Sequence, residues 1–252
     1  MDTLRVLILA AGKSTRMKSK YAKVLHRAGG RALIEHVVAG ARAVSQDIFV
    51  VVGHSAEQVK AAVAGVTFVE QKEQLGTGHA VLAARESFSG YAGDVLVMPG
   101  DVPLITPRSL EEFIRFHRDG GYQASVLTAD IENPAGYGRI VRRDNRDLDS
   151  IVEHRDASAE VLRISEINSG IYVFKAPALF ESLARLRNDN AQKEYYLTDV
   201  IQILARQKQR VGAFETKSAE EILGINTRQE LAGVDQIIRR KKCTALMAEG
   251  VT

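Results

Sequence analysis

The chain has 252 residues, of which 45% are hydrophobic and 26% charged, and this composition predicts an ordinary globular protein with a sizeable core. The formal net charge of +3 is small for this length, which argues against nucleic acid as a partner and predicts cations gathered at one anionic site. Cys243 is the single cysteine and no apolar run approaches the length of a membrane span, so we expect a cytoplasmic protein without disulfides or a membrane partner.

Short runs of valine, isoleucine and leucine alternate with segments of helical periodicity through the first half of the chain. This alternation is typical of strand-helix-strand units around a parallel sheet. The predicted strands are 4–9, 48–52, 66–69, 95–98 and 124–129, and the predicted helices are 32–43, 56–64, 77–86 and 109–118. Ligands of open α/β sheets bind beyond the carboxyl ends of the strands, so we expect the loops 10–22 and 99–104 to open onto one binding edge.

The pattern changes after about residue 130, where extended segments have less helix between them. We interpret residues 130–226 as a second lobe whose strands extend the sheet and wall the pocket. Its extended segments are 137–143, 150–154 and 167–174, followed by a helix over 197–205. The last segment, 227–250, is helical and loosely amphipathic, with apolar residues at broadly helical spacing: Leu231, Val234, Ile237, Ile238 and Leu246. The expected organisation is one α/β unit over 1–226 and a helical arm over 227–252.

The loop after the first strand carries Gly12-Lys13-Ser14, which would close a Walker A phosphate loop. Leu7 stands where that motif needs its first glycine, and Ser14 stands where the dinucleotide fingerprint needs its second. Both common phosphate loops are therefore excluded.

The same loop still suits an anionic ligand. Ala10, Ala11 and Gly12 are small and let a ligand approach the main chain closely. Lys13, Arg16 and Lys23 then supply three cations, as a polyphosphate requires, although a solvated flexible loop is the alternative interpretation.

Asp101 follows the predicted strand 95–98 in the segment "VMPGDVPL". A carboxylate there can hold Mg²⁺, which prefers a few oxygen ligands together with substrate phosphates, while the alternative is a turn-forming aspartate. Asn226 in "GINTR" is the candidate second ligand, or else the cap of the last helix. Cations and a candidate metal site, without an obvious nucleophile-base pair, favour phosphoryl or nucleotidyl transfer over acyl transfer.

Eight motifs occur in order: "LAAGKSTRMKS…AKVL", "EQLGTGHA", "GDVPL", "YGRI", "IVEH", "INSGIY", "EYYLTD" and "GINTR". Together they resemble the uridylyltransferase half of the bacterial bifunctional N-acetylglucosamine-1-phosphate uridylyltransferase/glucosamine-1-phosphate acetyltransferase family, over nearly the whole chain. The resemblance implies a Rossmann-like, mixed and mainly parallel sheet flanked by helices. It also implies Mg²⁺-dependent synthesis of UDP-N-acetylglucosamine and pyrophosphate from UTP and N-acetylglucosamine 1-phosphate, for cell-wall precursors.

The resemblance also implies a role for individual residues, with Arg16, Lys23 and Asp101 as the catalytic set. The nucleotide would be bound by Leu9, Ala10, Ala11, Gly12, Lys13, Lys23, Gln71, Gly76 and Thr77, and His79 would orient the loop near the base. Mg²⁺ would be bound by Asp101 and Asn226, and the sugar phosphate by Pro99, Gly100, Gly138, Glu153, Asn168 and Asn226.

Two departures from the family pattern bear on these expectations. Pro99 stands where many family members carry a hydroxyl-bearing residue, so a contact made there must come from the backbone or water, which puts the sugar-phosphate affinity in question. The hexapeptide repeats of the family's left-handed β-helix are absent from the 252 residues, so we assign neither acetyl transfer nor self-association through such repeats. The competing hypotheses are a related nucleotidyltransferase for another sugar 1-phosphate or dTTP, and a catalytically silent sugar-nucleotide sensor.

Overall fold

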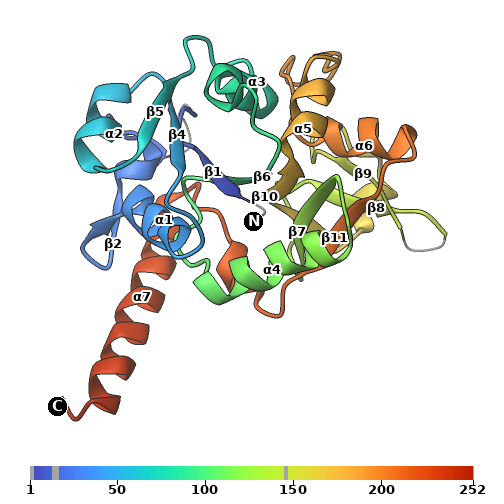
Figure 1. Cartoon of the computed structure of the whole chain (residues 1–252). Coiled ribbons are helices and arrows are strands. Elements are labelled where there is room, and N and C mark those ends of the chain that lie inside the picture. Colours follow the sequence, from blue (N-terminus) through green and yellow to red (C-terminus); the bar gives the residue numbers. More distant parts are fainter. Residues whose placement is uncertain (1–2, 13–16, 145–146, 252) are drawn as a thin grey trace.

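The computed structural model describes residues 3–12, 17–144 and 147–251, shown as a cartoon in Figure 1. Its centre is a block of four parallel strands. β1 (Leu4–Leu9) lies between β4 (Ile48–Val52) and β6 (Asp94–Pro99), and β5 (Thr67–Glu70) pairs with β4. The register pairs Leu9 with both Val51 and Pro99, so the segments after β1, β4 and β6 leave the sheet at one edge. The four strands match the predicted ranges within one residue.

The strands of the second lobe continue the same sheet, as expected. β10 (Glu166–Lys175) runs antiparallel between β6 and β7 (Ala124–Asp130), and β11 (Val211–Glu215) runs parallel to β7 at the edge. The hairpin of β8 (Arg139–Arg142) and β9 (Leu148–Val152) branches from β10. The result is a mixed, mainly parallel sheet with the order β11-β7-β10-β6-β1-β4-β5.

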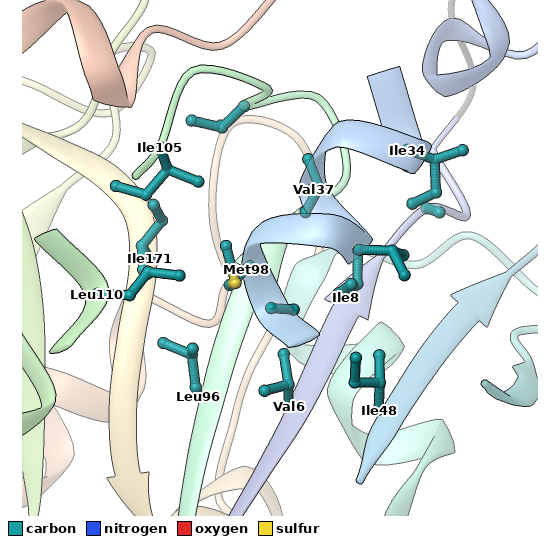
Figure 2. Packing of buried hydrophobic residues seen from close by; sticks show 14 of the residues in the cluster. Val6, Ile8, Ile34, Val37, Ile48, Leu96, Met98, Ile105, Leu110 and Ile171 are labelled. Atoms are coloured by element: carbon teal, nitrogen blue, oxygen red, sulfur yellow. The ribbon is translucent and has the colours of Figure 1, made fainter. Parts of the chain in front are cut away.

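Helices cover both faces of the sheet. One face packs against α1 (Leu33–Arg42), α2 (Ala56–Ala62) and α4 (Pro107–Asp119), and the other against α3 (Thr77–Ala83), α5 (Ala176–Leu183) and α6 (Asp199–Arg206). Figure 2 shows the first of these cores, where Ile34 and Val37 of α1 face β1 and β6. Because side chains alternate between faces and both faces are buried, the central strands read as continuous apolar runs.

Short elements complete the chain. They are the two-stranded hairpin β2 (Arg27–Ala28) and β3 (Arg31–Ala32), and the 3₁₀ turns η2 (Lys23–Leu25), η3 (Arg85–Phe88), η4 (Val161–Arg163) and η5 (Ala219–Ile222). No left-handed β-helix occurs in residues 3–12, 17–144 and 147–251. No helix among these residues has the length and apolar character needed to cross a membrane.

The final helix, α7 (Arg228–Ala248), confirms the predicted C-terminal helix. Its C-terminal part extends away from the rest of the molecule (Figure 1). Its first half packs in a small core with Ala28, Leu33, Leu104 and Ile225, through Leu231, Val234, Ile237 and Ile238. Leu246 is 39% exposed, so the predicted apolar stripe contributes to packing only near the start of the helix.

One predicted helix was too long, and two elements were missed. The predicted helix 77–86 ends at Ala83 and gives way to η3, and neither α5 nor β11 was expected. α5 begins directly after the ten-residue strand β10, and Pro177 in its first turn is the helix-start signal that the sequence offered. β11 has five residues, of which one is buried, so its sequence carries little alternation.

Candidate functional site

Three of the predicted site residues meet at the carboxyl edge of the sheet. Lys23 begins η2, Asp101 follows β6, and Asn226 precedes α7. The Lys23 ammonium forms an ion pair with Asp101 and donates a hydrogen bond to Asn226 Oδ1 at 3.1 Å. We call this group the Lys23–Asp101–Asn226 centre. It confirms that residues 203 positions apart share one location.

Backbone contacts hold the centre together. The N–H of Ile225 donates to the carbonyl oxygen of Asp101 at 3.1 Å, which fixes the segment before α7 on the segment after β6. Gly100 N donates to Leu9 O at 2.9 Å and ties Asp101 to the end of β1. A Cβ built on Gly224 would lie 3.9 Å from both carboxylate oxygens of Asp101, so the chain passes directly beside that side chain.

The donor set suits a hard cation. Oxygens of Asp101 and Asn226 already converge on one positive group, the ammonium of Lys23, and the Asp101 side chain is 13% exposed. Mg²⁺ is commonly bound by one or two protein oxygens and completed by water and substrate phosphates. In the described part of the chain no group of three or more histidine, cysteine or acidic side chains could hold a metal. Mg²⁺ bound here would therefore take its remaining ligands from a phosphate substrate and water.

The first loop opens beside this centre. Ala10 N donates to Val51 O at 2.8 Å, and a Cβ on Gly53 would lie 2.8 Å from Ala11 O, so the loop leaves β1 in close contact with β4. Gly12 is exposed, and among the described residues no atom lies within 4 Å of a Cβ built on it. Lys13 and Arg16, two predicted phosphate ligands, lie outside the described residues.

The predicted base-reading residues form a second group, beyond β5. Gln71 is 3% exposed, and its side-chain amide donates to Gly76 O at 3.2 Å and to His79 Nδ1 at 3.0 Å. Gln74 donates from its own amide to Gln71 O at 3.1 Å. The bonds to Gly76 and His79 hold the Gln71 side-chain amide in one orientation, and the bond from Gln74 holds the Gln71 backbone.

Thr77 is bound to the second lobe. Its hydroxyl accepts from Leu197 N at 3.0 Å, and two backbone bonds of 2.8 Å join Gly78 N to Tyr195 O and Tyr195 N to Leu75 O. A Cβ on Gly76, whose φ is +110°, would lie 2.6 Å from Tyr195 O. Glycine is therefore required here, because the two segments approach within backbone contact.

The three predicted sugar-binding residues of the second lobe also come together. Asn168 N donates to Gly138 O at 2.9 Å, and a Cβ on Gly138 would lie 3.5 Å from Glu153 Oε2. Burial raises the pKa of the Glu153 carboxyl, and the acidic neighbours Asp156, Asp199 and Glu194 raise it further, against a hydrogen bond from Thr198 that lowers it.

Pro99 lies on β6, between β1, which leads into the first loop, and β10, which carries Asn168. It ends β6 beside Leu9, and its Cγ would lie 3.1 Å from a Cβ built on Gly170 of β10. Gly170 has φ +77°, and its N–H donates to Asn168 Oδ1 at 2.9 Å. The ring of Pro99 therefore packs against the strand that carries Asn168.

Two site-adjacent side chains were not among the predicted residues. Thr198 donates its hydroxyl to Glu153 Oε1 at 3.3 Å, and Arg228 donates from Nε to Met17 O at 3.2 Å, joining α7 to the first loop. The motifs "EYYLTD" and "GINTR" contain both residues, but nothing in either motif reveals a contact with a segment so distant in sequence.

The chain is similar in sequence to curated proteins along nearly its whole length. The protein named "Bifunctional protein GlmU" from Alkaliphilus oremlandii is 47% identical over 251 residues, covering 99% of this chain and 55% of that protein. The protein of the same name from Halalkalibacterium halodurans is 45% identical over 254 residues, covering 100% of this chain and 56% of that protein. The chain thus spans about half the length of the curated relatives that it matches.

The fold is similar to that of a solved UDP-glucose pyrophosphorylase complexed with UDP-glucose. The TM-score is 0.78 at 19% sequence identity, and the alignment covers 96% of this chain and all of that one. The model of the MobA-like NTP transferase domain matches residues 6–207, a range that holds β1 to β10 and most of the predicted site residues. The chain therefore belongs to the family of MobA-like NTP transferase domains.

Proposed function

We propose that this chain transfers UMP from UTP to N-acetylglucosamine 1-phosphate and releases pyrophosphate. The observation that carries the proposal is the Lys23–Asp101–Asn226 centre, which lies at the carboxyl edge from which the first loop also departs. A triphosphate needs cations and a metal site at such an edge. The motif resemblance supplies the choice of uridine and of the N-acetylated sugar.

The nucleotide would be bound by two described groups. The backbone of residues 9–12 is exposed to a ligand at Gly12, and the Gln71 amide stands in the loop after β5. A uracil edge presents a donor between two acceptors, which a side-chain amide together with backbone groups can match. The sugar phosphate would be bound by Gly138, Glu153 and Asn168, which lie close together. The motif resemblance adds Pro99, Gly100 and Asn226 to this set.

The reaction is an in-line displacement. A phosphate oxygen of the sugar phosphate attacks the α-phosphorus of UTP, the bond to the β-phosphate oxygen breaks, and pyrophosphate leaves on the opposite side. This nucleophile is anionic at neutral pH, so the reaction needs no general base. Catalysis depends on positioning and on stabilisation of charge.

Lys23 supplies one of these charges. Its side chain is 24% exposed and pairs with Asp101, so the ammonium can reach a phosphate that binds beside the centre. Asp101 and Asn226 would hold Mg²⁺, which neutralises charge on the triphosphate when bound. Lys13 and Arg16 would bind phosphate oxygens from the same loop, as the motif resemblance implies.

The substrate assay measures pyrophosphate release from UTP and Mg²⁺ with three acceptors in parallel: N-acetylglucosamine 1-phosphate, glucosamine 1-phosphate and glucose 1-phosphate. We expect strong release only with the N-acetylated sugar, which would also show that Pro99 is tolerated. Preference for glucose 1-phosphate would show that the proposed sugar substrate is wrong. A folded protein that binds UDP-N-acetylglucosamine but releases no pyrophosphate would instead be a sensor.

Asp101→Ala tests the centre itself. Removal of a group that binds charge in the transition state lowers turnover by about 10²–10³-fold, whereas the fold should persist because Asp101 lies at the edge of the sheet. Asp47→Ala is the matched control, since Asp47 pairs with Arg5 before β4, at the opposite end of the strands. Turnover at the wild-type rate in Asp101→Ala would remove this carboxylate from the mechanism.

A further inference from the structure

The first turn of α7 contains a capping arrangement that extends beyond the helix. Thr227 Oγ1 accepts from Glu230 N at 3.1 Å, and Glu230 Oε2 accepts from Thr227 N at 2.8 Å, which together form a capping box. The same Glu230 oxygen also accepts from Asn226 N at 2.6 Å. This third bond satisfies a donor outside the helix, on the residue that contacts Lys23.

Asn226 is held from several sides. Glu230 binds its N–H, Ile225 N binds Asp101 O, and the Asn226 side-chain amide donates to Gly224 O at 3.5 Å. With its nitrogen turned toward Gly224, the side chain presents Oδ1 to the Lys23 ammonium. Glu230 makes its contact with the Asn226 N–H through a carboxylate, and hydrogen bonds to ionised acceptors are stronger than those to neutral ones.

We propose that Glu230 is a positioning residue for the Lys23–Asp101–Asn226 centre. Its carboxylate locks the Asn226 backbone so that Oδ1 points at the place where the metal and triphosphate bind. The inference rests on the proposed function, because it assumes that a metal-nucleotide complex binds at this centre. Residues that orient a metal ligand typically change metal affinity by about 10–100-fold when they are removed.

A purely structural role in α7 is the competing explanation, and the chain offers a matched control. Thr227→Ala removes the cap bond to Glu230 N and weakens the start of the helix, but leaves the Glu230 carboxylate and Asn226 N in place. Glu230→Ala removes the bonds to both backbone groups. Glu230→Gln keeps a side-chain oxygen that can accept the Asn226 N–H without the charge.

The experiment measures Mn²⁺ binding to the full chain in the presence of saturating UTP by the enhancement of water proton relaxation, which distinguishes protein-bound Mn²⁺ from the Mn²⁺–UTP complex in solution. Thermal unfolding and pyrophosphate release against Mg²⁺ concentration are measured on the same variants. We expect Glu230→Ala to raise the half-saturating Mn²⁺ concentration about tenfold, Glu230→Gln to give an intermediate value, and Thr227→Ala to change it less than about twofold at a similar loss of thermal stability.

Two results would overturn the inference. One is wild-type Mn²⁺ binding in Glu230→Ala, and the other is an equal loss of Mn²⁺ binding in Thr227→Ala, which would assign the effect to helix capping. If Glu230→Ala does not fold, Glu230→Gln is compared with Thr227→Ala by the same criteria. Wild-type protein that binds Mn²⁺ with UTP but releases no pyrophosphate would refute the proposed function alone, while wild-type protein that binds no Mn²⁺ would refute the inference.

Discussion

Glu153 is a predicted site residue whose charge the fold disfavours. It follows β9 and faces Gly138, and its acidic neighbours include Asp156 on the same segment. Because burial and these carboxylates raise its pKa, the folded state binds the Glu153 proton more tightly than the unfolded state does. The associated stability is fully present below the ordinary value of 4.5 and is lost as the pH rises through the folded-state pKa. A sugar hydroxyl that donates a hydrogen bond to the ionised carboxylate would offset part of this loss.

Glu153→Gln should therefore stabilise the free protein at pH 8 and have little effect at pH 4, as measured by urea unfolding at both values. The amide carries no charge to bury, so the benefit appears only where the wild-type carboxyl is ionised. The Michaelis constant for the sugar phosphate should rise about tenfold, while that for UTP stays near wild type, because one strong hydrogen-bond acceptor is lost.

Glu112→Gln provides a control of opposite sign. The hydrogen bond from Arg108 lowers the pKa of Glu112, so this carboxylate contributes stability above its ordinary value of 4.5 and loses it as the pH falls through the folded-state pKa. Glu112→Gln should lower stability slightly at pH 8. A stabilising effect of Glu153→Gln that is equal at pH 4 and pH 8 would show that charge burial is not its cause.

At the scale of elements, the loop before α3 connects the two predicted binding regions. Residues 75–78 bond to the segment 195–197, and the next residue, Thr198, binds Glu153. Gly76, which accepts a hydrogen bond from Gln71, lies in this loop. The loop is therefore in direct contact with the segment whose Thr198 binds the predicted sugar-binding residue Glu153. A shift of this contact would disturb both regions at once.

Gly76→Ala tests that connection. The φ of +110° and the 2.6 Å approach to Tyr195 O both oppose a Cβ, so we expect a loss of about 1–3 kcal/mol in the free energy of unfolding. The Michaelis constants for UTP and for the sugar phosphate should rise together. Gly233→Ala is the control, since a Cβ at that position on α7 meets nothing within 4 Å, and alanine there should stabilise by about 0.5–1 kcal/mol. An increase in only one Michaelis constant for Gly76→Ala would mean that the two regions are independent.

At the scale of the whole molecule, α7 divides into a packed half and an exposed half. Val234 is 5% exposed within the small core beside β2, and residues 239–251 are all exposed. Lys241 makes an ion pair with Glu220 at 3.0 Å, at the boundary between the halves. The stability that α7 contributes should come almost entirely from residues before Cys243, because buried apolar area is concentrated there.

A chain that ends at Lys242 should unfold at the same urea concentration as the 252-residue chain and retain its pyrophosphate release. Val234→Ala in the full chain should instead lose about 1.5–3 kcal/mol, because it removes buried side-chain volume next to Ile225 and Leu104. Loss of stability on removal of residues 243–252 would show that the exposed half of α7 is bound to something in solution.

Local patterns in the sequence predicted most of the elements. Strands buried on both faces read as continuous apolar runs, and this signal placed β1, β4, β5, β6 and β7 within about one residue of their observed bounds. The motifs between them placed Asp101 after a strand and Asn226 before a helix, which the structure confirms. α5 was missed although Pro177 marks its first turn, and β11 was missed because it is short and mostly not buried. The roles expected for Lys13 and Arg16 stay predictions, since both residues lie outside the described ranges.

The sequence by itself determined the α/β architecture, and it predicted the edge at which a ligand should bind and the residues expected there. Only the tertiary structure decided which of them meet: Lys23 with Asn226 across 203 positions, Thr77 with Leu197 across 120, and Glu153 with Thr198 across 45. The physical reason is that secondary structure follows from side-chain periodicity over a few residues, whereas these contacts depend on strand order and register in the sheet. The role proposed for Glu230 also depends on the tertiary structure. Its sequence signal is an ordinary capping box, and only the fold shows that the Asn226 it contacts lies beside Lys23 and Asp101.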